Sequence, residues 1–266
     1  MTKKYAMDFI DMMERSGKPR ESGLTLVRDP GMGAMQTRAF LESAAEYVDY
    51  VKFRNITPRL FSEESMCEKI KINHEYEVKV FTGGIYFEFA YMQGCVEQAF
   101  QYAVEMGFDA SEISDNIVPI SFAEKIQYVK QCKALGLQVF YEWGKKYPTE
   151  ALIVDEAAQE IEDLLEAGVS KVIMEESELD QLLGKRGEKQ EAERLGELFA
   201  RVGIDKLILE TSGEAQEIWL LTHYGKDINL GPNIAPDEVV WLEAMRRGLG
   251  RKVKYTALDR LMNPVG

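Results

Sequence analysis

Short apolar runs that carry charged residues near their ends recur along this sequence, and residues 139–146 form the clearest example. The apolar part is too short for a helix, contains Glu142 near its end, and is followed by a glycine, Lys145 and Lys146. Such a run is typical of a buried strand. Lysine is almost never fully buried without a partner, so both amines are expected where the strand leaves the core. The segment therefore predicts a strand that brings a carboxylate and two amines to one place.

Charged side chains stand at or just beyond the ends of six such runs. They are Asp29, Lys52, Glu112 with Asp115, Glu142 with its two lysines, Glu175 and Glu210. A single carboxylate in this position usually caps a helix, but repetition over six strands favours a common site. Clustered carboxylates repel one another, so a cation or lysines must lie between them.

Histidine is scarce, since the chain has only His74 and His223. A histidine-rich zinc or iron site is therefore excluded, and a metal must be bound through oxygen, which favours magnesium or manganese. We expect Mg²⁺ at the acidic strand ends. The candidate ligands are Asp29, Glu112, Glu142, Glu175 and Glu210.

Lysine is the best candidate for proton transfer or Schiff-base formation. The sequence has no Gly-x-Ser-x-Gly motif and no plausible Cys–His pair, so covalent acyl chemistry has no support. The candidate catalytic residues are Lys146, Lys145 and Glu142.

Eight strand-then-helix units of roughly 30 residues each predict a closed (β/α)8 TIM barrel, in which the strand ends converge on one face. The expected strands are 23–29, 48–53, 77–82, 110–115, the run within 139–146, 171–175, 206–210 and 228–230. Helices are expected at 36–47, 62–76, from the glycines at 83 and 84 to 106, and at 121–135, 154–167, 188–202, 215–224 and 236–249. An open doubly wound sheet is the rival, but Gly31 and Gly33 form only half of its phosphate fingerprint.

The chain has no linker or low-complexity tract, which predicts a single domain. We expect an amphipathic helix and polar lead at 1–22, the barrel at 23–252 and a tail at 253–266. A net charge of −13 over 266 residues argues against a nucleic-acid or membrane partner. Small anionic substrates stay possible where lysines cluster, and a homo-oligomer stays open. Three cysteines without a CxxC motif and the lack of a signal peptide favour a reducing, cytoplasmic location.

Several segments together resemble a known family. The stretches KPRESGLTLVRDPG, DYVKF, GGIYFE, GFDASEISD, YEWGKK, EAGVSKVIMEE, INL and LEAMRRGL are similar to the successive motifs of phosphosulfolactate synthase, an enzyme of coenzyme M biosynthesis. The resemblance runs from about residue 18 to 249. It implies a barrel, Mg²⁺, and the addition of sulfite to phosphoenolpyruvate to give (2R)-phospho-3-sulfolactate, with Lys146 as the general acid.

That chemistry suits the charged strand ends. Sulfite would attack the methylene carbon of phosphoenolpyruvate, and Mg²⁺ would stabilise the negative charge that builds on the carboxylate while Lys146 protonates the adjacent carbon. Lysine and glycine-rich loops, including the loop and helix start after residue 231, would hold the anionic groups. The candidate substrate-binding residues are Lys52, Arg54, Gly83, Gly84, Ser114, Asn229 and Gly231.

The sequence also departs from the motifs of this family, as a divergent member would. Where relatives read close to VKFGWGTS, this chain has Arg54 in VKFRNITP, and where they read EGRESG, Ser177 replaces the arginine. Either Arg54 restores the lost charge, or the pocket takes a different anion. Three alternatives stay open: a related barrel enzyme for another small anionic acid, a non-catalytic barrel with a binding or stress role, and a Schiff-base aldolase that uses Lys146.

Overall fold

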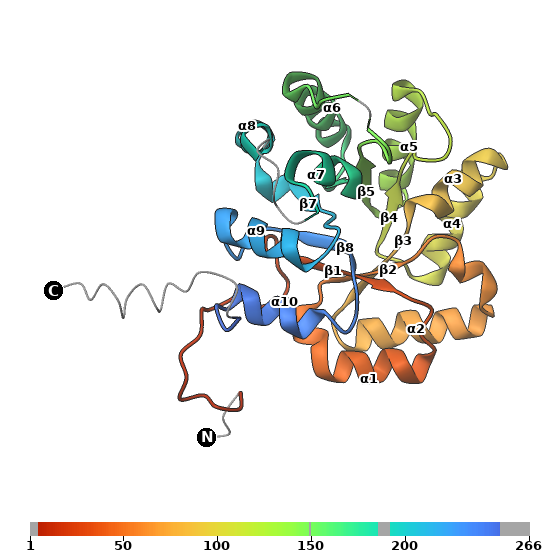
Figure 1. Cartoon of the computed structure of the whole chain (residues 1–266). Coiled ribbons are helices and arrows are strands. Elements are labelled where there is room, and N and C mark those ends of the chain that lie inside the picture. Colours follow the sequence, from red (N-terminus) through yellow and green to blue (C-terminus); the bar gives the residue numbers. More distant parts are fainter. Residues whose placement is uncertain (1–4, 149, 186–191, 251–266) are drawn as a thin grey trace.

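The computed structural model describes residues 5–148, 150–185 and 192–250, and within them eight parallel strands close into a barrel in sequence order (Figure 1). This confirms the predicted TIM barrel. The strands are β1 Thr25–Asp29, β2 Tyr50–Phe53, β3 Lys79–Thr82, β4 Ala110–Ile113, β5 Gln138–Trp143, β6 Lys171–Met174, β7 Leu207–Leu209 and β8 Leu230–Ile234.

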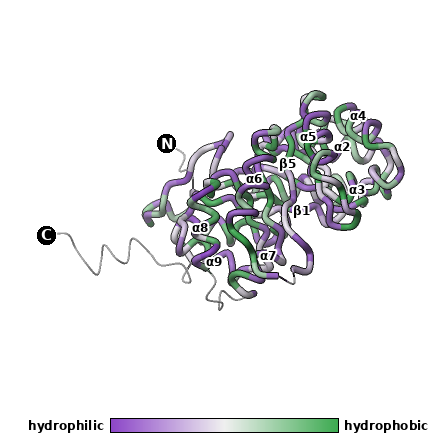
Figure 2. The backbone as a smooth tube through the Cα atoms, turned by 90° about the horizontal axis from the view of Figure 1, so that it is seen from above, coloured by the Kyte–Doolittle hydropathy of each residue, from purple (hydrophilic) through white to green (hydrophobic). Residues whose placement is uncertain are grey.

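Helices surround the barrel and follow the strands in alternation (Figure 1). The α-helices are α1 Ala34–Ala44, α2 Glu63–Glu75, α3 Gly84–Met92, α4 Val96–Met106, α5 Phe122–Ala134, α6 Val154–Ala167, α7 Glu176–Leu183, α8 Ala192–Val202, α9 Glu214–Tyr224 and α10 Val239–Arg246. Short 3₁₀ helices lie at Ala45–Tyr47, Thr57–Leu60 and Ile204–Lys206. Figure 2 shows hydrophobic and hydrophilic residues alternating along the helices, as expected where one side of each helix packs on the barrel.

The core has two parts, one inside the barrel and one between the strands and the helices. Tyr50, Phe81 and Phe140 meet edge to face inside the barrel. The outer part is larger and includes Val27, Val51 and most apolar helix residues. Strands buried on both faces carry nearly continuous apolar sequence. The strands could therefore be found in the sequence, but the direction of each side chain could not.

Four predicted boundaries need correction. Residues 5–22 contain turns and extended chain but no helix. The single helix expected up to residue 106 is divided into α3 and α4, because the chain turns at Gly94, where φ is +66°. The helix α7 was not predicted, and β8 begins at Leu230, where the predicted strand ended. The predicted tail at 253–266 lies outside the described residues.

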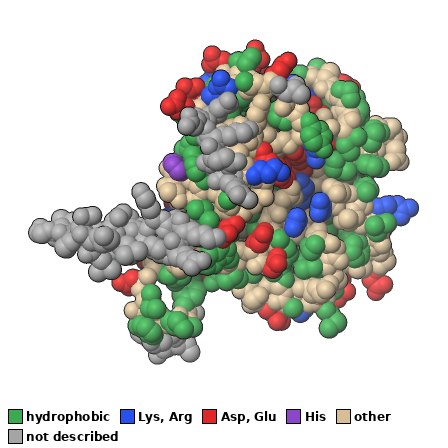
Figure 3. All heavy atoms as spheres, in the orientation of Figure 1, with side chains coloured by type: hydrophobic (Ala, Val, Ile, Leu, Met, Phe, Trp, Pro, Cys, Tyr) green, Lys and Arg blue, Asp and Glu red, His purple; other side chains and the backbone are tan. Residues whose placement is uncertain are grey.

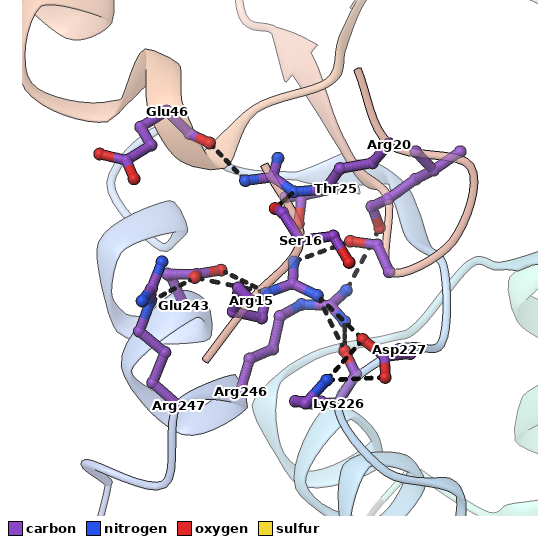
Figure 4. Close-up of polar contacts among 12 residues, drawn as sticks. Arg15, Ser16, Arg20, Thr25, Glu46, Lys226, Asp227, Glu243, Arg246 and Arg247 are labelled. Atoms are coloured by element: carbon purple, nitrogen blue, oxygen red, sulfur yellow. Dashed lines mark hydrogen bonds and ion pairs between the residues drawn. The ribbon is translucent and has the colours of Figure 1, made fainter. Parts of the chain in front are cut away.

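Arginine side chains tie the N-terminal segment to the end of the barrel opposite the charged strand ends (Figure 4). Arg246 is fully buried and donates to the backbone carbonyls of Lys226 and Ile228. Arg15 lies next to it and pairs with Glu243 and Asp227. Backbone carbonyls and carboxylates bind these guanidinium groups and fix the N-terminal segment in an irregular, non-helical course.

Candidate active site

The inner face of the barrel changes from apolar to charged toward the carboxyl ends of the strands. On β2, Tyr50 belongs to the apolar interior, and Lys52, two residues later, projects from the same face. The Lys52 ammonium lies 2.8 Å from Oε1 of Glu112 on β4 and 3.8 Å from Oε2 of Glu142 on β5. All of these side chains are buried. The predicted strand-end charges of β2, β4 and β5 therefore come together at the mouth of the barrel.

Gly83 and Gly84 make room for this arrangement instead of forming the predicted anion cradle. A Cβ on Gly83 would lie 3.0 Å from Cε of Lys52, and a Cβ on Gly84 would lie 2.9 Å from Oε1 of Glu112. The Gly84 N–H donates to Glu112 at 2.8 Å, and the Gly83 N–H donates to the carbonyl of Phe53. Neither N–H is free to bind a substrate anion.

Burial and mutual repulsion separate the charge states of the two carboxyl groups. Burial raises the pKa of Glu112 to about 8, against the attraction of Lys52 and with the repulsion of Glu142. Burial also pushes the pKa of Glu142 upward, but Lys52, a hydrogen bond from the Glu112 carboxyl and Lys146 outweigh it, so the net shift is downward. Burial lowers the pKa of Lys52, yet the surrounding carboxylates raise it above its usual value overall. Burial and repulsion therefore favour the protonated form of Glu112, and the nearby cations favour the ionised form of Glu142.

Glu175 and Glu210 follow β6 and β7 directly and are almost fully buried. Glu210 accepts a hydrogen bond from Asn233, and burial, with the repulsion of Glu142, raises the pKa of Glu210 to about 8. Burial also raises the pKa of Glu175, although the Ser177 N–H, which donates to that carboxylate, opposes the shift. The acidic side of the mouth thus extends over β4 to β7.

Lys146 approaches the acidic residues from the loop after β5. Its positive charge lowers the pKa of Glu142 and acts in the same direction on Glu175. Lys145 instead lines a groove beside α6, and its backbone N–H donates to Glu178 at 2.9 Å. Of the two adjacent lysines, Lys146 is the one whose charge acts on the site. Figure 3 shows acidic side chains in a hollow near the centre of the face in view, with lysine or arginine side chains beside them.

Asp29, a predicted metal ligand, lies outside this cluster. Its carboxylate accepts hydrogen bonds from the N–H groups of Gly31 and Met32 and forms a buried ion pair with Lys69 of α2. The Lys69 ammonium also lies 4.4 Å from the ring centre of Phe61. Because β1 side chains alternate between faces, Asp29 points toward the helices and stabilises the β1–α1 loop.

Three further candidates also have structural partners, and the fourth is exposed. Asn229 precedes β8 at the opposite end of the barrel, where its side chain bonds the backbone of Leu24 and Leu207. The buried Ser114 hydroxyl donates to Glu88. Gly231 lies so close to β1 that a Cβ there would be 2.4 Å from the carbonyl oxygen of Leu26. Arg54 is exposed on the loop after β2 and has no side-chain partner among the described residues.

Two asparagines at the site were missed by the sequence analysis. Asn116 donates to Oε1 of Glu142 at 2.5 Å, and Asn233 donates to Glu210. Asn116 follows β4 and Asn233 lies within β8, but asparagines in such positions are common and gave no distinct signal. Arg28 was also overlooked, although it lies within β1, beside Lys52 in the strand register.

The protein offers few oxygen ligands for a Mg²⁺ ion at this site. Among the described residues, no group of three or more acidic, histidine or cysteine side chains converges on a point. Two buried oxygens, Oε2 of Glu112 and Oε2 of Glu210, have no hydrogen-bond partner there, which fits an added proton or cation. Mg²⁺ commonly takes one or two carboxylates and completes its shell with substrate and water. The donor set therefore suits Mg²⁺ without forming a complete cage.

Comparison with known proteins decides the family. The model of the family described as (2R)-phospho-3-sulfolactate synthase (ComA) matches residues 13–251. The chain belongs to this phosphosulfolactate synthase family. Phosphosulfolactate synthase of Methanothermobacter thermautotrophicus is 36% identical over 92% of this chain and 95% of that protein, and the Methanocaldococcus jannaschii enzyme is 35% identical over 86% and 92%.

The chain also has more distant similarities. The Arabidopsis thaliana protein HEAT-STRESS-ASSOCIATED 32 is 24% identical over 91% of this chain and 92% of its own length. The crystal structure of 3-hexulose-6-phosphate synthase from Salmonella typhimurium matches with a TM-score of 0.52 at 10% identity, over 84% of this chain and all of that one, which supports the fold alone. Among the described residues, none of the helices has the length and apolar character needed to cross a membrane.

Proposed function

We propose that this family member adds sulfite to phosphoenolpyruvate and forms (2R)-phospho-3-sulfolactate. The family match supports the reaction, and the observation that carries it to this chain is the position of Lys146. Lys146 is exposed in the segment that follows β5, and its charge lowers the pKa of Glu142 and opposes the upward shift of Glu175, while Lys52 is buried among the carboxylates. This arrangement offers a proton donor and a cation on an otherwise acidic surface.

In the proposed reaction, a lone pair of sulfite sulfur forms a bond to the methylene carbon of phosphoenolpyruvate. The electrons of the carbon–carbon double bond move toward the carboxylate, and the Lys146 ammonium gives a proton to the carbon that bears the phosphate. The negative charges of Glu142 and Glu175 would attract the Lys146 ammonium toward that carbon, and Asn116 fixes the Glu142 carboxylate. Burial favours the protonated form of Glu112, which would limit the negative charge that the incoming anions meet.

We propose Mg²⁺ as the cofactor, bound by one or two of the carboxylates of Glu142, Glu175 and Glu210 and completed by substrate and water. When bound, it would stabilise the enolate charge on the substrate carboxylate. We therefore expect activity to fall to the detection limit after exhaustive chelation and to return when Mg²⁺ is added. Full activity in the chelated protein, measured with metal-free substrates, would contradict this proposal.

The direct test mixes purified protein with sulfite, phosphoenolpyruvate and Mg²⁺ and follows both substrates. We expect them to disappear in equal amounts, with a new phosphate-ester resonance in the ³¹P spectrum. Borohydride treatment with a carbonyl substrate distinguishes a Schiff-base aldolase, because sulfite addition forms no imine and Lys146 would stay unmodified.

A reaction with another small anionic acid is the second candidate. The observation that favours it is Ser177 at the position of the family arginine, where the Ser177 N–H contacts Glu175 and the side chain supplies no positive charge. Consumption of a different phosphorylated or sulfonated acid, with none of phosphoenolpyruvate, would favour this candidate.

A further inference from the structure

Arg28, in strand β1 of the barrel, takes part in none of the side-chain contacts described above. On β1, Leu26 belongs to the apolar interior of the barrel, so Arg28, two residues later, projects from the same face. In the strand register, Arg28 is the partner of Lys52. The two cations therefore enter the barrel mouth side by side from neighbouring strands.

The two cations differ in their surroundings. Lys52 lies among carboxylates, whereas Arg28 forms no ion pair or side-chain hydrogen bond with any residue that the structure describes. Arg28 is nevertheless half-buried. The buried arginines at the other end of the barrel, such as Arg20 and Arg246, all bind carboxylates or carbonyls. A partly desolvated guanidinium without a partner is costly, so Arg28 is placed to receive an anion from outside the protein.

The distribution of charge around the mouth limits where an anionic group can bind. Glu112, Glu142, Glu175 and Glu210 follow or belong to β4–β7, and they repel phosphate from that side. In a barrel of this kind, alternate strands contribute to one layer, which puts Arg28 of β1 level with Gly83 of β3. Lys52 fills the space over Gly83, since a Cβ there would lie 3.0 Å from Cε of Lys52, so this side of the mouth carries positive charge.

We propose that Arg28 binds the phosphate group of the substrate and supplies the positive charge that Ser177 lacks. The inference rests on the proposed function for the identity of the substrate, and on the β1 geometry for the site. A guanidinium can donate two parallel hydrogen bonds to phosphate, a geometry that lysine does not reproduce. Arg54 is the competing arginine, but it lies exposed on a loop, whereas Arg28 is fixed within a strand.

The test compares Arg28→Met and Arg28→Lys with Arg38→Met. Arg38 lies on α1 and forms a surface ion pair with Glu75, so Arg38→Met removes the same charge outside the barrel. Titration calorimetry with inorganic phosphate measures binding without any reaction. We expect Arg28→Met to bind phosphate about 10-fold to 100-fold more weakly, in the range for a lost charge-assisted hydrogen bond, Arg28→Lys to lie in between, and Arg38→Met to match the parent protein.

Kinetic measurements identify the anion. We expect the KM for phosphoenolpyruvate to rise in Arg28→Met and the KM for sulfite to stay within about twofold. A rise for sulfite alone would overturn the phosphate assignment, and so would equal phosphate binding by Arg28→Met and the parent, or no phosphate binding by the parent. If the parent protein consumed no sulfite but lost phosphate binding on Arg28→Met, the proposed function would fail while the Arg28 site stood. Circular dichroism confirms that each variant is folded.

Discussion

At the scale of single residues, the site depends on one buried amine among carboxylates and one amine at the mouth. Lys52 is held between Glu112 and Glu142 and serves the charge balance of the site. Lys146 is exposed, and its charge acts on Glu142 and Glu175. The two lysines are therefore suited to different tasks, and Lys146 is the one that can reach a substrate carbon.

We expect Lys146→Ala to lower kcat by roughly 100-fold or more, the usual scale for loss of a general acid, with little change in melting temperature. Lys145→Ala removes a neighbouring amine that lines a different groove, and its kcat should change far less. Steady-state kinetics on both variants provide the comparison. If Lys145→Ala were the more damaged variant, the assignment of the proton donor would be reversed.

A buried carboxyl group outside the site gives a prediction about pH. Burial raises the pKa of Glu217 from 4.5 to about 7, and the side chain contacts Thr211. Between these two pH values the unfolded chain releases the proton while the folded chain keeps it, so stability falls as pH rises. We expect Glu217→Gln to remove this loss, with a relative gain of about 1 to 3 kcal/mol at pH 8 compared with pH 4. Denaturant titrations at both pH values test it, and parallel pH profiles for the two proteins would contradict it.

The sequence showed which strand ends carry charged side chains, but not whether each side chain points into the barrel or toward the helices. Glu112, Glu142, Glu175 and Glu210 were identified at strand ends and do gather at one face. Asp29 was assigned to the same cluster because β1 is apolar on both faces, and such a strand has no alternation that reveals which side chains point inward. For the same reason Arg28 was overlooked.

At the scale of elements, the β4–α5 loop is organised by one carboxylate. Glu88 of α3 is fully buried and accepts hydrogen bonds from Ser114 and from the N–H groups of Asn116, Ile117 and Val118. The loop then presents the Asn116 amide to Glu142. A helix packed on one side of the site thus sets a contact within it.

We expect Glu88→Gln to loosen this loop, because an amide replaces one acceptor oxygen with a donor that faces other donors. The predicted cost is about 1 to 3 kcal/mol of stability, faster hydrogen exchange at residues 116–118 and a lower kcat. Glu124→Gln is the matched control, since Glu124 is a half-buried residue that accepts a hydrogen bond from the Ser121 N–H at the start of α5 and none from residues 116–118. Unchanged exchange at 116–118 in Glu88→Gln would show that the loop does not depend on this carboxylate.

The strands and most helices could be predicted from apolar periodicity, whereas the loops could not. The contact of Asn116 depends on the course of the loop after β4, and the contact of Asn233 depends on where β8 ends. Local sequence specifies neither. Asn229 was expected within the eighth strand but precedes β8, which begins at Leu230.

At the scale of the whole molecule, the two ends of the barrel have different tasks. One end is closed by Arg15, Arg20 and Arg246, which bind backbone carbonyls and acidic partners (Figure 4). The other end gathers unpaired or partly paired charges, which is the arrangement expected where ligands supply the missing partners. The apolar layer of Tyr50, Phe81 and Phe140 fills the barrel interior between its two ends and separates them.

The central claim is that this barrel joins sulfite to phosphoenolpyruvate and that a lysine delivers the proton. The most direct measurement is mass spectrometry and proton NMR of the product formed in deuterium oxide. Because lysine protons exchange with solvent, we predict one deuterium on the carbon that bears the phosphate and none on the carbon that bears sulfur. The absence of a sulfonated product at saturating substrates and Mg²⁺, or a product with deuterium on the carbon that bears sulfur, would contradict the account.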